Sequence, residues 1–289
     1  MMPAAPPRPL RSALFVPAAK PRALEKSAGL AVDALIFDLE DSAAREEKEG
    51  ARERLAAQLA ALPDGGPFRV ARVNALGEGG AEDIAALSGL GAVLLPKVES
   101  AAMLAALDEG LTGAGAPEAL ELWAMVETPR GILAAQEIAA ARLSRPVGAL
   151  VVGPNDIVLS TGIRLSPGRP ELVPWLMQVV LAAKAAGVAV LDGVYNDFRD
   201  AEGLARECAQ ARALGFAGKT LIHPNQIGAA NAAFAPSAGE IAAAERIVAA
   251  FALPAHAGRG VISLDGRMVE RLHLEEARAL LAFRDRLEN

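Results

Sequence analysis

The chain has 289 residues, 52% of them hydrophobic and only 4% aromatic, which is enough for a large core of aliphatic side chains. The net charge of −6 and the absence of a Lys/Arg cluster argue against nucleic acid or an anionic membrane as a partner. A single cysteine, Cys208, excludes an internal disulfide, and no apolar run approaches the roughly 18 residues that a bilayer requires. We therefore expect a cytoplasmic protein.

The first ten residues are rich in proline and lack the apolar segment of a secretory signal, so we expect a flexible lead-in over residues 1–10. Beyond them, short aliphatic runs alternate with stretches of helical periodicity. The predicted strands are 12–17, 34–41, 68–74, 92–99, 121–128, 147–153, 188–195 and 219–224. The clearest helical patterns between them are 46–62, 132–142, 174–187 and 201–215.

Apolar strands separated by helices are typical of a parallel sheet covered on both faces. Eight such units favour a closed α/β barrel, the (β/α)8 or TIM barrel, over an open doubly wound sheet. We place this barrel at residues 11–236. Residues 237–289 exceed what the barrel needs, and they read as a helix, a hairpin with an Asp-Gly turn and an amphipathic helix. The prediction is thus a TIM barrel with a C-terminal extension.

Polar side chains gather at the C-terminal ends of the predicted strands, the face on which such barrels build active sites. They are Glu40, Asp41, Arg72, Asn74, Lys97, Glu99, Glu127, Thr128, Asn196 and His223. A buried carboxylate without a partner costs several kcal/mol, so Glu40 and Asp41 need partners. We expect the two acids to hold metal-bound waters or to orient Arg72 and Lys97.

Glu127 and Asp156 follow neighbouring predicted strands, in "WAMVETPRG" and "LVVGPNDIVL". Two carboxylates on adjacent strand ends can share one hard cation such as Mg²⁺, with water and substrate oxygens as the other ligands. The residues alone leave open ordinary ion pairs, or a helix cap at Asp156. Zinc is disfavoured because the three histidines are not paired on one face and there is one cysteine.

Basic side chains in the motifs have different interpretations, two for Arg72 and His223 and one for Lys48 with Arg52. Arg72 in "FRVARVN" can grip a carboxylate or thioester oxygen, whereas a solvated role suits Arg69 better. His223 is either a hydrogen-bonded histidine at a strand end or a donor facing a ligand. Lys48 and Arg52, four residues apart, are predicted to form a solvated helix face.

The stretch "GFAGKT" suggests a phosphate loop, but it fails that test. Ala213 stands where the first glycine is required, and a strand follows instead of a helix. We therefore predict that Gly215 ends a helix and that Lys219 opens the eighth strand.

Several motifs, taken in order, carry a family resemblance: "RSALFVPAAKPRALEKS", "DALIFDLEDS", "ARVN", "LLPKVES", "VETPRGILAAQEIA", "GPNDI", "LDGVYNDFRDAEGLAREC" and "GFAGKTLIHPNQI". From Arg11 to about Leu281 the chain resembles the HpcH/HpaI aldolase–citrate lyase superfamily, in the citrate lyase β-subunit-like branch that includes malyl-CoA and citramalyl-CoA lyases. This resemblance implies a (β/α)8 barrel in a homotrimer or homohexamer.

The resemblance also implies site residues. Mg²⁺ would be held by Glu127 and Asp156, and Arg72 would contact the substrate. The first loop after a strand would meet the CoA thioester through Phe15, Lys20 and Lys26. Two positions in this loop depart from the family: Ala18 replaces a common glycine, and Lys20 stands where many relatives carry another residue.

The C-terminal extension departs from the family at its acid. In related lyases, an Asp in a "G-x-M-I-D" stretch is the acid/base, supplied by a lid over a neighbouring subunit. Here the stretch is "DGRMVERLHLEEA", which places Glu270 at that position. Its "VExLH" form resembles malyl-CoA thioesterase-like members, so both carbon–carbon cleavage and thioester hydrolysis stay open.

From this resemblance we predict an enzyme, a Mg²⁺-dependent lyase that cleaves or forms a 3-hydroxyacyl-CoA such as malyl-, citramalyl- or citryl-CoA. Arg72 would meet the enolate charge, and Glu270 would carry the proton. A malyl-CoA thioesterase that uses the same site is the alternative. Less favoured are a class II pyruvate aldolase, because Ser42 follows Glu40–Asp41 where that branch has histidine, and a citrate lyase subunit acting on an acyl-carrier substrate.

Overall fold

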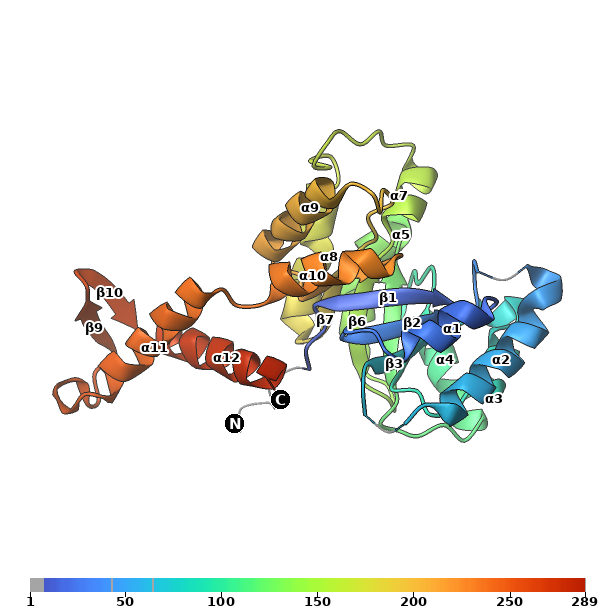
Figure 1. The fold of residues 1–289 in the computed structure, drawn as a ribbon, viewed down its shortest axis with the longest axis horizontal. Helices are drawn as coiled ribbons and strands as arrows, with labels where there is room; N and C mark the ends of the chain where they lie inside the picture. The colour runs from blue at the N-terminus through green and yellow to red at the C-terminus, as the bar shows by residue number, and fades with distance from the viewer. Residues whose placement is uncertain (1–7, 43, 64, 289) are drawn as a thin grey trace. The chain divides into compact units, whose positions relative to one another are not determined.

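The computed structural model describes residues 8–42, 44–63 and 65–288, and the chain divides into two compact units at Phe234. In the larger unit, which begins at Leu10, eight parallel strands pair in sequence order, and the last pairs with the first to close a barrel. Figure 1 shows β1 and β2 of this unit side by side, with helices around the strands. The strands are β1 (Ser12–Pro17), β2 (Ala34–Asp38), β3 (Phe68–Arg72), β4 (Ala92–Leu95), β5 (Glu121–Val126), β6 (Val147–Val152), β7 (Ala189–Asp192) and β8 (Gly218–Leu221). The predicted (β/α)8 barrel is confirmed.

Helices connect the strands. They are α1 (Pro21–Ser27), α2 (Lys48–Ala61), α3 (Gly80–Ala86), α4 (Ala101–Gly113), α5 (Pro129–Leu133), α6 (Ala135–Ala139), α7 (Pro154–Thr161), α8 (Val173–Ala186), α9 (Ala201–Leu214) and α10 (Ile227–Phe234). The pattern at 132–142 proves to be two short helices, the first of which begins at Pro129 because the Thr128 side chain caps it. Gly215 ends α9 with a φ of +95°, as predicted. No helix of the described residues is long and apolar enough to cross a membrane.

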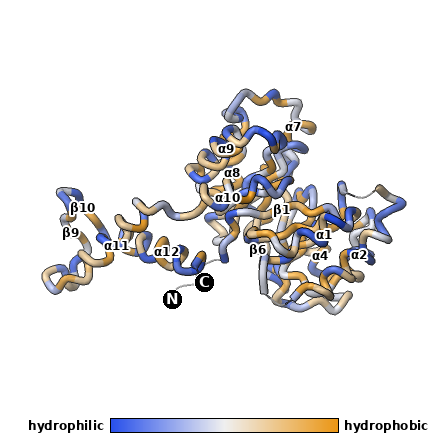
Figure 2. Tube along the Cα trace, viewed as in Figure 1, coloured by the Kyte–Doolittle hydropathy of each residue, from blue (hydrophilic) through white to orange (hydrophobic). Residues whose placement is uncertain are grey.

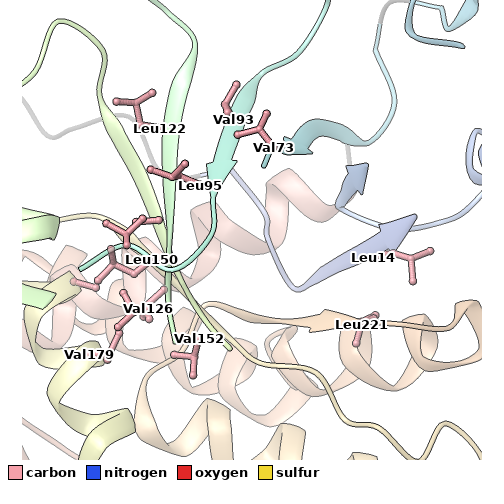
Figure 3. Close-up of a cluster of buried hydrophobic side chains, with 14 of the residues drawn as sticks. Leu14, Val73, Val93, Leu95, Leu122, Val126, Leu150, Val152, Val179 and Leu221 are labelled. Carbon is pink, nitrogen blue, oxygen red and sulfur yellow. The ribbon is translucent and has the colours of Figure 1, made fainter. Parts of the chain in front are cut away.

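Side-chain alternation along the strands divides the core into two layers. In β5, Trp123 and Met125 belong to a cluster inside the barrel, whereas Leu122 and Val126 belong to the layer between the strands and the helices. Figure 3 shows this outer layer, in which Val126 lies close to Val179 of α8. A polar residue just past a strand therefore faces the barrel mouth only if it continues the inner phase, that is, if it lies an even number of positions from the residues of that strand that point into the barrel.

The smaller unit contains a helix, a hairpin and a second helix, the order that the sequence predicts. Its elements are α11 (Ala238–Ala252), β9 (Val261–Leu264), β10 (Arg267–Glu270) and α12 (Arg271–Glu288). The hairpin turn has positive φ at Asp265 and Gly266, the pattern of a tight primed turn. Its apolar side packs Ile262 and Val269 against α11. Hydrophilic and hydrophobic residues interleave along α12 in Figure 2, typical of an amphipathic helix.

Candidate functional site

A cavity of about 190 Å³ opens at the C-terminal ends of the barrel strands. The strand residues that line it continue the inner phase: Asp38 follows Ile36 by two positions, and Arg72 likewise follows Val70. The phase therefore delivers charged side chains to the mouth of a barrel whose interior is otherwise apolar. Its polar lining residues are Asp38, Asp41, Arg72, Glu127, Asn155, Asp156 and Thr220.

Arg72 is the centre of the charge network in this cavity. Its Nε donates to Asp38 Oδ1 at 2.7 Å, Nη1 lies 2.8 Å from Glu40 Oε2, and Nη2 lies 3.1 Å from Asp41 Oδ2. The guanidinium also lies 4.9 Å from the ring centroid of Phe15. Burial by itself lowers the pKa of Arg72, but the hydrogen bond and charge of Asp38, with the other two acids, outweigh it and raise the pKa. Arg72 is thus a fixed, oriented cation.

Lys97 joins two acids of the site. Its Nζ donates to Glu40 Oε1 at 2.5 Å, and its backbone N–H donates to Glu127 Oε1 at 2.8 Å. The residue has a φ of +50°, uncommon for a side chain other than glycine, just past the end of β4. Burial raises the pKa of Glu40, although the charges of Arg72 and Lys97 oppose that shift. This turn therefore holds both carboxylates in place.

Glu127 is the most deeply buried acid of the cavity, with 1% of its surface exposed, and Asp156 lies in the first turn of α7. Burial, together with the charges of Asp156 and Glu40, raises the pKa of Glu127 to about 7, against the hydrogen bond from Lys97. A Cβ at Gly153 would lie 2.2 Å from Glu127 Oε2, so only glycine leaves room for this carboxylate.

The charge balance of the cavity fits a hard divalent cation. Among the described residues in or beside the cavity, five carboxylates, from Asp38, Glu40, Asp41, Glu127 and Asp156, meet two cations, Arg72 and Lys97, which leaves a formal excess of three negative charges. Among the described residues, no three His, Cys, Asp or Glu side chains are grouped to hold a metal. Two carboxylates with remaining positions for water and substrate is how Mg²⁺ is commonly bound, so Glu127 and Asp156 fit that ion.

The remaining predicted residues lie elsewhere. Lys20 and Lys26 are exposed at the start and in the last turn of α1. His223 is exposed as well, and its Nδ1 accepts the N–H of Asn225 at 3.2 Å. Its ring stacks on Phe198, with centroids 4.8 Å apart. Among the described lining residues the cavity includes the preceding Ile222, but not His223. Glu270 belongs to the smaller unit.

Sequence reasoning missed Asp38 as a site residue, although it is the shortest contact of Arg72 among the described carboxylates. The signal was the alternation of Ala34, Ile36 and Asp38, which puts the acid on the inner face. The predicted strand over 34–41 also ends earlier, at Asp38, so that Glu40 lies in the following loop.

The prediction that Lys48 and Arg52 are solvated is wrong. The Lys48 ammonium hydrogen-bonds to Asn74 Oδ1, and Arg52 Nε donates to Asp83 Oδ1 at 2.7 Å. Asp83 is fully buried and also accepts the backbone and side-chain N–H groups of Asn74. Because α2 packs against α3, this helix face pairs with Asn74 in the loop after β3 and with Asp83 of α3 instead of with water.

Residues 11–224 match the family model described as HpcH/HpaI aldolase/citrate lyase. The chain is 47% identical over 278 residues to a (3S)-malyl-CoA thioesterase of Cereibacter sphaeroides, covering 95% of this chain and 94% of that protein. It is 35% identical over 283 residues to the citrate lyase subunit beta of Escherichia coli K12, covering 95% and 93%.

A crystal structure of the protein CitE from Mycobacterium tuberculosis, in complex with magnesium, acetoacetate and coenzyme A, resembles this fold with a TM-score of 0.75. The two chains are 34% identical, and the match covers 96% of this chain and 98% of that one. The family model spans most of the barrel, and these relatives extend over nearly the whole chain. The chain therefore belongs to the HpcH/HpaI aldolase/citrate lyase family, as its motifs indicate.

Proposed function

We propose that this protein hydrolyses the CoA thioester of a 3-hydroxy acid such as (3S)-malyl-CoA, with Mg²⁺ as its cofactor. The observation that carries the proposal is the acid excess around buried Glu127, which calls for a dication beside a fixed arginine. The 47% identity to a (3S)-malyl-CoA thioesterase supports the substrate and reaction. The magnesium and coenzyme A named for the CitE structure support the cofactor and the thioester.

Within this proposal, Glu127 and Asp156 hold the cation, and the cation when bound acts as a Lewis acid toward substrate oxygens. Arg72 donates its guanidinium N–H groups to the thioester oxygen as negative charge develops there. Asp38, Glu40 and Asp41 hold that guanidinium in place before reaction, so little reorganisation is needed. The exposed cations Lys20 and Lys26 would meet the CoA phosphates.

Glu270 is the proposed proton carrier. It takes a proton from the water that adds to the thioester carbonyl, and it returns the proton to the sulfur as the carbon–sulfur bond breaks. Glu270 pairs with Val261 across the hairpin, and Met268 lies two positions before it on the same face. Val261 is 47% and Met268 67% exposed. Apolar side chains beside an acid favour a covered face, so we propose that the hairpin closes over a neighbouring subunit's cavity in a homotrimer or homohexamer.

Carbon–carbon cleavage is the second candidate, favoured by the 35% identity to citrate lyase subunit beta. The same cavity would then stabilise an enolate through Arg72, and Glu270 would protonate the enolate carbon. An acyl-carrier substrate belongs with this candidate. A pyruvate aldolase is disfavoured, since Ser42 follows Asp41 where that branch has histidine.

Product analysis tests the proposal. The protein is incubated with malyl-, citramalyl- and citryl-CoA and Mg²⁺ in water enriched in ¹⁸O, and the products are identified by mass. Hydrolysis releases CoA together with ¹⁸O-labelled malate, whereas lyase activity releases acetyl-CoA and glyoxylate from malyl-CoA. Turnover that is independent of Mg²⁺ after chelation, or no turnover of any of the three thioesters, would contradict the proposal.

A further inference from the structure

The junction between β10 and α12 is held by one histidine. The backbone N–H of Glu270, the last residue of β10, donates to Nδ1 of His273 at 3.0 Å. Glu270 lies opposite Val261, and the next residue, Arg271, donates its N–H to Gly260 O at 3.1 Å. Hydrogen-bonded and non-bonded pairs alternate in an antiparallel ladder, so the Glu270 N–H points away from β9. Among the described residues no third strand pairs with this hairpin, and His273 supplies the acceptor.

This bond is half of a capping box. With α12 beginning at Arg271, Glu270 is the N-cap and His273 is the third helical residue, a position from which Glu or Gln normally bonds back to the N-cap N–H. The same unit contains the complete form at α11, where Glu240 Oε2 accepts the N–H of Ser237 at 2.7 Å. His273 therefore performs the return bond with an imidazole nitrogen.

The Glu270 carboxylate itself is left available. Among the described residues, no side chain or backbone group forms a hydrogen bond or ion pair with it. Its backbone is fixed on one side by the hairpin ladder and on the other by His273, while the carboxylate shares the face of Val261 and Met268. The junction thus combines a restrained backbone with an unengaged acid.

We propose that His273 is a positioning residue that holds Glu270 for proton transfer, an inference that rests on the proposed role of Glu270. An Nδ1 that accepts a hydrogen bond carries no proton, so the N–H of this ring is at Nε2. Without the His273 acceptor, the Glu270 N–H has no partner, because it points away from β9. The backbone at the junction between β10 and α12 then gains conformational freedom. Misplacement of a reacting group by about 1 Å is enough to slow a reaction strongly.

The test compares His273→Ala and His273→Gln in the 289-residue chain, with kcat and KM measured on the thioester that the protein turns over. We expect His273→Ala to lower kcat about tenfold, equivalent to about 1.4 kcal/mol, with KM changed less than twofold. Gln can restore the return bond, so His273→Gln should stay within about twofold of the parent kcat. The control is His256→Ala, which removes a histidine bonded to Ala250 O at 2.7 Å in the same unit and should leave kcat unchanged.

A double-mutant cycle separates positioning from general destabilisation. If His273 acts through Glu270, adding His273→Ala to Glu270→Gln causes no further loss of kcat. A further tenfold loss, or a His273→Gln variant as slow as His273→Ala, would overturn the inference. If Glu270→Gln keeps the parent kcat, the proposed proton carrier itself is wrong. If His273→Ala fails to fold, the kcat of His273→Gln still tests the inference, because a tenfold loss of kcat in His273→Gln contradicts it.

Discussion

Two buried charge networks lie on opposite faces of the barrel wall, an inner one on β2 and β3 and an outer one on β7 and β8. The outer network pairs Asp192 of β7 with Lys219 of β8 at 2.7 Å, and Arg169 grips the same carboxylate with two bonds of 2.8 Å. Glu207 of α9 completes it, 2.5 Å from the Lys219 ammonium. Two acids meet two bases, and neither Asp192 nor Lys219 is exposed.

The inner network around Arg72 is equally charged but unbalanced, and it opens onto a cavity. The contrast is clearest in two acids of nearly equal burial. Burial alone would raise the pKa of Asp192. The charges of Lys219 and Arg169 outweigh burial, so the pKa of Asp192 is lowered. Burial raises the pKa of Glu127 as well, but here the charges of Asp156 and Glu40 add to the shift, and the pKa rises to about 7. Charge balance, and not burial, distinguishes the closed network from the one that needs a cation from outside.

The largest expected effect is a loss of activity and of Mg²⁺ binding when Glu127 is removed from the inner network. We expect Glu127→Ala to lower kcat/KM by roughly 10³-fold and to abolish the rise in melting temperature that Mg²⁺ gives the parent protein. Steady-state kinetics and thermal unfolding with and without Mg²⁺ measure both. Glu121→Ala, at the other end of β5, is the control and should keep the Mg²⁺ response. Full activity of Glu127→Ala in fresh Mg²⁺ would remove this residue from the site.

In the outer network, where the charges balance, we expect a substitution to lower stability and to leave Mg²⁺ binding unchanged. Asp192→Ala leaves two buried cations facing one acid, and it should lower the free energy of unfolding by about 3–5 kcal/mol. Urea unfolding measures this, and the folded fraction should keep its Mg²⁺ response. Glu202→Ala removes an exposed acid 3.6 Å from Arg206 on α9, and its effect should stay below about 1 kcal/mol. Equal stabilities of the two variants would contradict the assignment of the outer network as structural.

The raised pKa of Glu127 predicts a dependence of stability on pH in metal-free protein. Its ordinary pKa is 4.5 and its folded value about 7, so between these pH values the folded chain holds more protons than the unfolded chain. Stability from this group is present below pH 4.5 and is lost as pH rises towards 7. Glu127→Gln keeps an acceptor for the Lys97 N–H and should gain at most about 3 kcal/mol over the parent at pH 8. A stability difference that stays constant from pH 4.5 to 8 would refute this.

The smallest expected effect concerns the space around Glu127. Gly153→Ala brings a methyl group against the Glu127 carboxylate, which should cost about 1–3 kcal/mol of stability and lower kcat/KM about tenfold. Gly228→Ala is the matched control, since a Cβ there meets nothing within 4 Å in helix α10. Calorimetry and kinetics on both variants provide the comparison. A Gly153→Ala protein with parent kinetics would show that Glu127 tolerates displacement.

The sequence predicted the strands well because each is a run of apolar residues, a property of neighbours along the chain. All eight strands lie where those runs stand, and the helix–hairpin–helix order after the barrel also follows from local signals. The position of Arg72 and Glu127 at strand ends came from the same pattern. Asp38 was missed because its strand is otherwise apolar: the alternation with Ala34 and Ile36 puts the three residues on one face, but it does not say that this face is the inner one.

Local patterns alone therefore determined the barrel, the order of its elements and the end of the barrel at which polar residues collect. Tertiary structure decided which charges meet: Glu40 and Lys97 are 57 residues apart, and Asp192 and Lys219 pair only because β7 and β8 are in register. It also decided that Lys48 and Arg52 bind Asn74 and Asp83 instead of water. Periodicity records contacts between residues near in the chain, whereas a charge selects its partner only after the barrel closes and brings distant strands together.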